Sequence, residues 1–389
     1  MPDDVTRHIS QPIQRMLWGK AAGRCEFAGC NKELWKSSVT QEEVNIAQQA
    51  HIWSFSDEGP RGHDAVSETE LNTLGNLMLV CHQCHRKMDK QQDGGRYSVD
   101  LLRAMKEQHE RRIGIVTGIA PEKRSHILLY GANIGDHESP LQYALAAEAL
   151  FPDRYPADDR PIVIGAVGSL RDVDADFWSV ERLSLARKFD QQVRSRMTGG
   201  EISHLSVFAR APQPLLILLG TFLTDISEVD VFQLCREPKG WRWANDETHL
   251  ELRIAEPANP HGVPALVLSL SATITDDRIV DVLGEPASIW RVTIPKPHND
   301  FLRSRSQLAT FRRAMRDLMD RIKATHGEEV TLHVFPAMPI AAAVELGRIR
   351  MPKADLDWQV YDQVKQLGGF VPALSIEKGS PACPLATVS

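Results

Sequence analysis

The sequence has no run of apolar residues near the roughly 20 that a membrane-spanning helix needs, although 42% of its 389 residues are hydrophobic. Its first eleven residues, MPDDVTRHISQ, are polar and lack the apolar segment of a signal peptide. We therefore expect a cytoplasmic protein with no membrane partner.

Positive charge is not in excess either. The formal net charge is −6, which argues against a protein that coats nucleic acid through bulk charge. Residues 1–124 hold as many Lys and Arg as Asp and Glu, so the net negative charge falls on the rest of the chain. This balance permits contact with DNA in the first segment and disfavours it in the second.

Cysteine is scarce, with six residues in the chain. Two are isolated, and the other four form two close pairs, Cys25-x4-Cys30 and Cys81-x2-Cys84. In a reducing cytosol, such clustered thiols indicate metal ligands rather than disulfides. Four thiolates form the closed shell of a structural zinc, which leaves no open position for catalysis. We predict that this zinc folds a segment with little core of its own.

The pattern of the chain changes near residue 120. Residues 1–120 end in SVDLLRAMKEQHERRIG, a predicted closing helix with Ser98 as its N-cap. Residues 121–389 alternate apolar strands such as PIVIGAVG and ALVLSLSAT with amphipathic helices, one of them after a predicted cap at Asn299. Such alternation predicts an α/β fold with parallel sheets covered by helices. We therefore predict two domains, residues 1–120 and 121–389.

The second domain repeats itself at an offset of 127 residues, from Ser206 to His333. The segments 206–220 and 333–347 align without gaps and keep Val, Phe, Pro and Gly in register. Any two α/β units share some of this pattern, but the shared register favours a duplication, with repeats over roughly 122–250 and 251–370. We expect IVIGAVGS and LVLSLSAT to be the matching first strands. Duplicated α/β units usually form one cleft where the carboxyl ends of their strands meet.

Histidines and an asparagine surround the cysteine pairs. The strings AHI, GNLMLVC and CHQCH place His51, Asn76 and His85 in this order. The arrangement resembles an HNH endonuclease of the ββα-metal fold over roughly residues 15–112. The resemblance implies metal-dependent cleavage of double-stranded DNA.

These residue types suit phosphodiester hydrolysis. His51, neutral near pH 7, can take a proton from the attacking water. Asn76 can orient the His51 ring through a hydrogen bond, and His85 can hold a divalent cation, for which hydrated Mg²⁺ is the expected choice. Family members often carry Asp or His before the first His, whereas this sequence has Ala50. Asp89, one turn after His85 on the same helix face, is the predicted supporting ligand. Other nearby donors are His63, Asp64 and His82.

The second domain contains none of the motifs GxxxxGK[ST], GxSxG or GxGxxG. An α/β module without a catalytic signature, attached to a nuclease, suggests control. Its segments HLSVFARAPQPLLILLG, IPKPHNDFLRSRSQLATFRRAM and LHVFPAMPIAAAVELGRIRMPKADLDWQVYD resemble the SAVED domain, over roughly residues 122–370. That domain consists of two fused CARF-like, Rossmann-like units and binds cyclic oligonucleotides. HNH followed by SAVED looks like the effector nuclease of a bacterial CBASS antiphage system.

The resemblance implies a ligand-gated enzyme. A cyclic di- or trinucleotide would bind in the cleft between the repeats, promote a homo-oligomer and activate DNA degradation with little sequence preference. Its phosphates need cationic or amide partners, and its bases need aromatic ones. The candidates at or after the predicted strand ends are Ser169, Leu170, Arg171, Arg210, Thr273, Arg278, Pro336, Trp358 and Tyr361.

Two other functions fit parts of the sequence. A constitutive, restriction-like nuclease whose second domain recognises modified DNA would cut without an added nucleotide and would carry a basic second domain. The acidic balance there weighs against it. A zinc module for DNA binding or assembly, without enzymatic activity, would be indifferent to the loss of His51.

Overall fold

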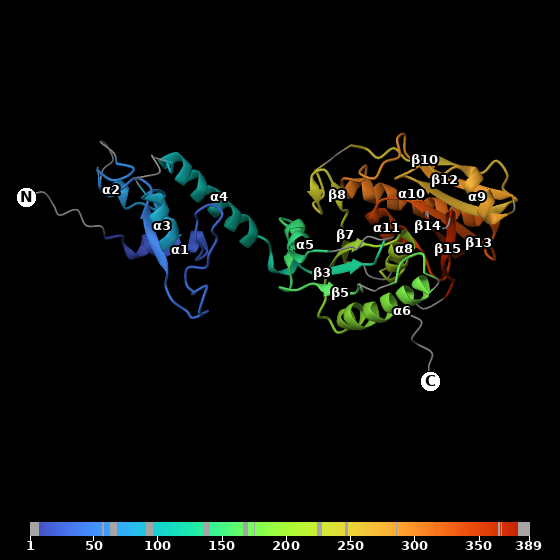
Figure 1. Ribbon diagram of the computed structural model, residues 1–389, viewed down its shortest axis with the longest axis horizontal. Helices are drawn as coiled ribbons and strands as arrows, with labels where there is room; N and C mark the ends of the chain where they lie inside the picture. The colour runs from blue at the N-terminus through green and yellow to red at the C-terminus, as the bar shows by residue number, and fades with distance from the viewer. Residues whose placement is uncertain are drawn as a thin grey trace, which may run out of the picture. The chain divides into compact units, whose positions relative to one another are not determined.

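The computed structural model describes residues 8–379 apart from positions 57, 63–67, 91–95, 135–140, 166–169, 175, 224–227, 246–247, 285, 365 and 367. The chain divides into two compact units, Met1–Pro121 and Glu122–Ser389, and Figure 1 labels those of their helices and strands for which there is room. Within the described ranges, we find no helix with both the length and the apolar character that crossing a bilayer requires.

The first unit is built on two short antiparallel strands, β1 and β2. Their register pairs Ala47 with Cys81 and His51 with Leu77. Helix α3 begins directly after β2, so the second cysteine pair spans the junction, with Cys84 inside the helix. The elements of this unit are α1 (Gln11–Ala21), β1 (Ala47–His51), α2 (Glu68–Leu71), the 3₁₀ helix η1 (Leu74–Asn76), β2 (Leu77–Cys81), α3 (His82–Met88) and α4 (Val99–Thr117).

Helix α4 closes the first unit, as its sequence predicts. The Ser98 hydroxyl accepts a hydrogen bond from the amide of Leu101 at 3.3 Å, so the predicted N-cap is confirmed. Buried Leu102 joins α4 to a hydrophobic core made with α1, β2 and the cysteine loops. The charged side of α4 also reaches inward, where Lys106 lies 3.8 Å from the buried carboxylate of Glu26.

The second unit contains two sheets. In the first, the strand order is β4-β3-β6-β7, with β5 also on β3, and every pair is parallel. In the second, the order is β10-β12-β11-β13-β14-β15, and only the pairs with the edge strands β10 and β15 are antiparallel. Parallel strands joined by helices confirm the predicted α/β class.

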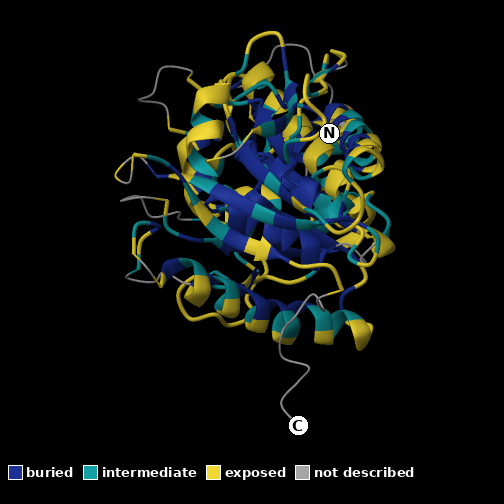
Figure 2. Cartoon of the chain, turned by 90° about the vertical axis from the view of Figure 1, so that its right-hand side faces the viewer, coloured by how far each residue is buried: buried dark blue, intermediate teal, exposed yellow. Residues whose placement is uncertain are grey.

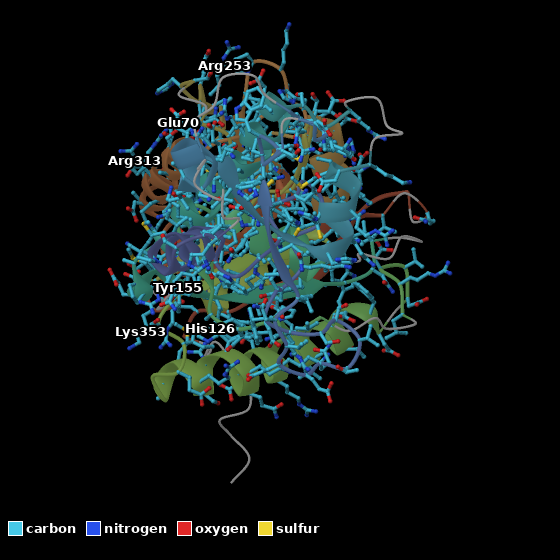
Figure 3. All side chains as sticks on the ribbon, turned by 90° about the vertical axis from the view of Figure 1, so that its left-hand side faces the viewer. Glu70, His126, Tyr155, Arg253, Arg313 and Lys353 are labelled. Atoms are coloured by element: carbon cyan, nitrogen blue, oxygen red, sulfur yellow. The ribbon has the colours of Figure 1, made fainter. Side chains whose placement is uncertain are left out.

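The elements of the second unit follow in chain order. They are η3 (Pro121–Lys123, which begins at the boundary), β3 (Arg124–Gly131), α5 (Tyr143–Leu150), β4 (Tyr155–Pro156), β5 (Ile162–Val163), α6 (Phe177–Phe189), η4 (Asp190–Arg194), α7 (Ser195–Thr198), β6 (Leu205–Arg210), α8 (Gln213–Phe222), β7 (Val229–Val231), β8 (Cys235–Arg236), β9 (Lys239–Gly240), β10 (Arg253–Ala255), β11 (Val263–Ser269), α9 (Asp276–Leu283), β12 (Ala287–Thr293), α10 (Arg305–His326), β13 (Thr331–Ala337), α11 (Ile340–Ile349), β14 (Asp357–Val364) and β15 (Gly369–Ile376). Tyr155 and His126, labelled in Figure 3, lie on the paired strands β4 and β3.

The two sheets share one arrangement, β3-β6-β7 in the first and β11-β13-β14 in the second. In each, the strand of the aligned segment leads through a proline into a helix, α8 or α11. The expected match of first strands is wrong, because β11, which contains LVLS, corresponds to β3 rather than to the strand in PIVIGAVG. Strand β3 carries the polar residues Ser125 and His126 near its start, which hid its apolar character.

One helix start also differs from expectation. Helix α10 is capped by Ser304 rather than by Asn299. The Ser304 hydroxyl accepts from the amide of Gln307, whose side chain in turn accepts from the amide of Ser304 at 3.3 Å, so the cap is a reciprocal box. The Ser-x-x-Gln spacing is the sequence signature of this cap.

The helices α8 and α11, which correspond in the two repeats, touch backbone to backbone. A Cβ atom on Gly220 would collide with the carbonyl oxygen of Val344, and one on Gly347 would collide with that of Ile217. Both positions therefore need glycine because of close approach. Around this contact, one hydrophobic core joins residues of both sheets. Figure 2 shows these buried residues in dark blue in the strands and exposed residues in yellow on the outer helices.

Replacement of Gly220 by Ala should destabilise the second unit. Because the new methyl group meets backbone rather than a flexible side chain, α8 and α11 must separate, and we expect a loss of about 3 kcal/mol in the free energy of unfolding. Urea unfolding followed by tryptophan fluorescence measures this loss. The control is Gly369→Ala in β15, where the added Cβ meets nothing within 4 Å. Equal stability of the two variants would contradict the packing argument.

Candidate functional sites

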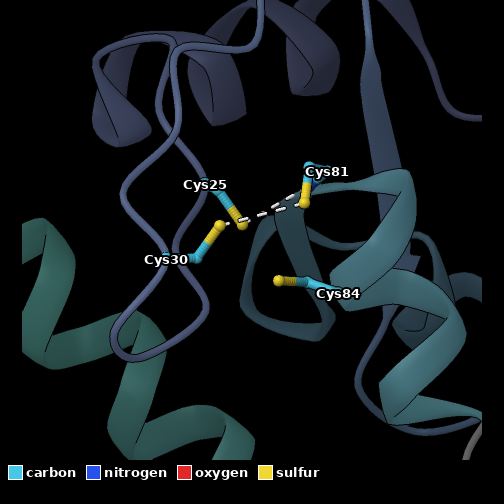
Figure 4. Close-up of side chains that lie close together, drawn as sticks. All are labelled: Cys25, Cys30, Cys81 and Cys84. Atoms are coloured by element: carbon cyan, nitrogen blue, oxygen red, sulfur yellow. Dashed lines mark hydrogen bonds between the residues drawn. The ribbon is translucent and has the colours of Figure 1, made fainter. Parts of the chain in front are cut away.

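Four thiols of the first unit converge on one point. The Sγ atoms of Cys25, Cys30, Cys81 and Cys84 all lie within 4.8 Å of one another, and Figure 4 shows them pointing into the same space. The Sγ atoms of Cys30 and Cys81 are 3.9 Å apart. Four sulfurs placed tetrahedrally around zinc at its usual bond length lie about 3.8 Å apart. The donor set and its spacing therefore fit a closed structural zinc site.

Burial opposes the thiolates that zinc requires. It raises the pKa of Cys25 to about 12, and it raises the pKa of Cys84, with a further contribution from the charge of Cys25. Burial acts in the same direction on Cys81, but hydrogen bonds from the Cys84 backbone and the other thiols outweigh it and lower the Cys81 pKa. A cation at the centre favours all four thiolates at once. The cluster therefore has the chemistry of a site completed by a metal ion.

His51 ends strand β1 with its ring partly exposed. Its Nε2 lies 2.9 Å from Oδ1 of Asn72, and its ring centroid lies 5.5 Å from that of Phe55. An amide oxygen only accepts hydrogen bonds, so Nε2 donates its proton to Asn72, and in the neutral ring Nδ1 then keeps its lone pair. A neutral imidazole held in this way presents Nδ1 as a base.

Asn76 does not orient the His51 ring, which corrects the prediction for this residue. It is buried, and among the described residues its side chain bonds only to backbone. Its Oδ1 accepts from the amide of Trp53 at 2.7 Å, while its Nδ2 donates to the carbonyls of Leu71 at 3.0 Å and Trp53 at 3.3 Å. Asn76 therefore holds the turn after His51, and Asn72 orients the ring. Two asparagines four residues apart looked alike in the sequence, and the path of α2 and η1 decides between them.

His85 lies within α3. Its Nε2 is 3.7 Å from Oδ2 of Asp89, one turn later, and both side chains are about one third exposed, at 33% and 39%. A ring nitrogen and a carboxylate oxygen this close can share one divalent cation. The other oxygen of Asp89 accepts a hydrogen bond at 2.8 Å from Arg61, a buried residue that the sequence reasoning missed.

The remaining candidate donors lie elsewhere. Ala50 pairs with Met78 and belongs to the hydrophobic core, so a longer residue at position 50 would face the core. His82 is exposed at the start of α3. His63 and Asp64 lie outside the described residues. The fit of a catalytic cation therefore depends on His85 and Asp89.

A groove of about 830 Å³ opens beside the turn that Asn76 holds. In it, the guanidinium of Arg103 lies 6.0 Å from the ring of Trp53, two residues after His51. The basic residues Arg86, Lys87 and Lys90 are exposed on or just after α3. The exposed cationic side chains next to His85 suit a phosphate backbone, whereas the groove itself is lined by three basic and three acidic residues. The lining residues of the groove are Lys20, Trp53, Glu70, Thr73, Leu74, Gly75, Asn76, Arg103, Lys106, Glu107 and Glu110.

The residues predicted to bind a ligand in the second unit differ in exposure. Those with exposed or partly exposed surfaces are Leu170, Arg171, Arg210, Thr273 and Arg278. Those that are buried are Pro336, Trp358 and Tyr361. Ser169 lies outside the described residues. The exposed and partly exposed residues include three arginines and a threonine, whose side chains can donate hydrogen bonds to a phosphate.

Trp358 and Tyr361 are core residues, which corrects their predicted role in stacking on a base. Trp358 is 1% exposed, and Tyr361 is 5% exposed. The Tyr361 ring stacks on Phe335 with centroids 4.4 Å apart, and its hydroxyl lies 2.9 Å from Nδ1 of His333. Trp358 belongs to the hydrophobic core that joins the two sheets, and Tyr361 belongs to a smaller core with Phe335 and Phe370, so both aromatic rings are already covered. The same burial in β13 removes Pro336 as a contact.

The two repeats adjoin near the carboxyl ends of their strands. Gln213, at the start of α8, accepts from the amide of Met338 at 3.2 Å and donates to its carbonyl at 3.1 Å. Burial, together with the nearby carboxylate of Asp172 from the first repeat, raises the pKa of Asp362 to about 7. A phosphate bound nearby would favour the protonated form of Asp362.

Comparison with known proteins identifies part of the second unit. Residues 185–376 match the family model of SAVED, the "SMODS-associated and fused to various effectors sensor domain". The match runs from the second half of α6 to the end of β15, so this part of the chain is a SAVED domain. No curated protein matches the sequence of the chain.

Solved structures of SAVED/CARF-domain receptors also resemble the chain. The Acinetobacter baumannii Cap4 receptor with the cyclic trinucleotide 2'3'3'-cAAA has a TM-score of 0.42 and 14% identity, covering 75% of this chain and 62% of that chain. The Cap4 receptor of Moraxella osloensis has a TM-score of 0.38 and 12% identity, covering 75% and 60%. The chain thus spans less than two thirds of the length of these receptors.

Replacement of Cys84 by Ser should remove a bound metal from the first unit. A serine hydroxyl binds zinc weakly compared with a thiolate. Without the metal, the segment of Cys25 and Cys30 is no longer linked to the segment of Cys81 and Cys84. We expect about one zinc per chain in the parent protein and little in the variant, measured by elemental mass spectrometry, together with a lower melting temperature. Cys235→Ser, at an isolated buried cysteine of the second unit, is the control. Equal metal content in the parent and Cys84→Ser would contradict the assignment.

Proposed function

We propose that this chain is a ligand-gated endonuclease. Its SAVED domain senses a cyclic oligonucleotide, and its first unit then cuts double-stranded DNA with little sequence preference, as an effector of antiphage defence. The observation that carries the proposal is the match of residues 185–376 to a sensor domain found fused to effectors. The first unit is a separate compact unit, and His51 there has the geometry of a general base.

His51 supplies the base in this proposal. With Nε2–H held by Asn72, Nδ1 takes the proton of a water whose oxygen bonds to phosphorus. The P–O bond to the leaving sugar breaks in the same displacement, and the leaving oxygen takes up a proton from solvent. The neutral tautomer is therefore the active form of His51.

His85 and Asp89 would hold the catalytic cation, because their Nε2 and Oδ2 atoms lie 3.7 Å apart on one helix face. A bound Mg²⁺ would offset the negative charge that develops on the scissile phosphate. The four cysteines would hold a separate structural zinc, which would fix the junction between β2 and α3. The exposed Arg86 and Lys87 would position the DNA through its phosphates.

Control would come from differential binding. A ligand activates only to the extent that it binds the active state more tightly than the resting one. We propose that the active state is a homo-oligomer in which several first units meet the same DNA. The exposed or partly exposed Arg171, Arg210 and Arg278 are the phosphate partners that the second unit offers.

Plasmid cleavage tests the enzyme and its gating together. The protein is incubated with plasmid and Mg²⁺, with and without each member of a panel of cyclic di- and trinucleotides. The first member is 2'3'3'-cAAA, the ligand of the Acinetobacter Cap4 receptor. We expect nicking and degradation only with one member of the panel. His51→Ala should lower the rate by roughly 10²–10⁴-fold, whereas His8→Ala, at an exposed histidine of the same unit, should not. Cleavage without any nucleotide would support the restriction-like alternative, and undiminished cutting by His51→Ala would sink the catalytic assignment.

The two asparagines should separate activity from stability. Asn72→Ala frees the His51 ring, and we expect it to lower the cleavage rate by roughly tenfold to a hundredfold with little change in unfolding. Asn76→Ala removes the hydrogen bonds from this side chain to the backbone of Trp53 and Leu71, and we expect it to cost about 2 kcal/mol of the free energy of unfolding. Cleavage assays and urea unfolding of both variants check this. The assignment fails if Asn72→Ala cuts at the parent rate.

A further inference from the structure

The guanidinium of Arg61 is a buried charge beside the candidate nuclease site. Its side chain is 6% exposed. Nε donates to the carbonyl of Ile52 at 2.7 Å, and Nη1 donates to that of Met88 at 2.6 Å. Nη2 donates to the carbonyl of His51 at 3.3 Å and to the carboxylate of Asp89 at 2.8 Å. Each nitrogen of this guanidinium thus has a protein partner.

These partners come from two different segments. The carbonyls of His51 and Ile52 belong to the end of β1, while Met88 and Asp89 belong to the end of α3. The first segment carries the candidate base, and the second carries the candidate cation ligands. Arg61 itself stays in place because its amide donates to Ser54 Oγ at 3.1 Å. The guanidinium is therefore a rigid link between the two halves of the site.

Packing alone does not account for an arginine at this place. A buried guanidinium is costly unless its donors are satisfied, and an apolar side chain of similar volume would fill the same space without that cost. The planar fork of arginine can meet several acceptors at fixed angles, which lysine cannot do. Arginine in addition orients the Asp89 carboxylate: it binds one oxygen, and the other oxygen faces His85 Nε2.

We propose that Arg61 is the positioning residue of the nuclease site: it fixes Asp89 beside His85 and holds both at a set distance from His51. This inference rests on the proposed nuclease function. Loss of Arg61 releases the carboxylate of Asp89 and loosens the end of β1. The cation ligands and the base are then no longer held in position to act on the same phosphate. Asp89 is the group through which Arg61 acts on the cation.

A set of variants tests this role. Arg61→Gln keeps part of the hydrogen bonding, Arg61→Lys keeps the charge, and Asp89→Asn and the double variant Arg61→Gln/Asp89→Asn test the coupling. The matched control is Arg24→Gln, because Arg24 also joins a backbone carbonyl (Asn31) to a carboxylate (Glu33) in the same unit. Zinc content and melting temperature report folding for every variant.

The first readout is hydrogen exchange without added Mg²⁺. We expect Arg61→Gln to increase exchange in residues 51–54 and 86–90, whereas Arg24→Gln leaves these segments unchanged. The second readout is cleavage as a function of Mg²⁺ concentration. We expect the apparent Mg²⁺ affinity of Arg61→Gln to fall roughly tenfold to a hundredfold. Arg61→Lys should recover little of it, and the double variant should lose no more than Asp89→Asn alone, because Arg61 acts on the cation through Asp89.

Unchanged exchange in both segments, or unchanged Mg²⁺ dependence in a folded Arg61→Gln, would overturn the inference. Additive losses in the double variant would also overturn it, because Arg61 would then act independently of Asp89. If Arg61→Gln does not fold, Arg61→Lys takes its place in both readouts. A parent protein that cuts no DNA with any nucleotide would refute the nuclease function, while the exchange experiment would still decide whether Arg61 links the two segments.

Discussion

The packing of the second unit depends on two glycines, one in α8 and one in α11, where any side chain would collide with the backbone of the other helix. Gly220 and Gly347 let the backbones of α8 and α11 come into contact, and one hydrophobic core joins residues of both repeats beside a smaller core in each. Because the helices start at the strand ends, this contact also sets how the carboxyl edges of β6 and β13 adjoin, with Gln213 joined to the backbone of Met338. Any ligand between the repeats must bind within that fixed geometry. A change at this contact is the kind of packing change that a bistable interface can amplify.

The first unit satisfies its buried polar groups differently. Its strands are short, so many backbone groups near His51 have no ladder partner, and side chains take their place. Asn76 pairs with the backbone of Trp53 and Leu71, and Arg61 pairs with the carbonyls of Ile52 and Met88. Unpaired, these groups would cost free energy on burial. The same side chains therefore complete the fold and shape the site.

The candidate site was partly predictable from the sequence. The cysteine spacing indicated a cluster, and the four thiols do converge. His85 and Asp89 were expected on one helix face because their spacing is one turn, and they lie 3.7 Å apart. Asn72 and Arg61 were missed, because each reaches its partner through a loop whose path no local pattern encodes.

In the second unit, composition and periodicity by themselves determined the α/β class and the aligned strand-turn-helix segments of the two repeats, because local hydrophobic patterns follow strand and helix periods. Only the tertiary structure decided which strands correspond, since β3 is recognised by its neighbour β6 rather than by its own apolar run. It also decided that Trp358 and Tyr361 face a packed core. An aromatic residue has the same sequence signature in a core and in a binding site, and only the elements packed around it distinguish the two.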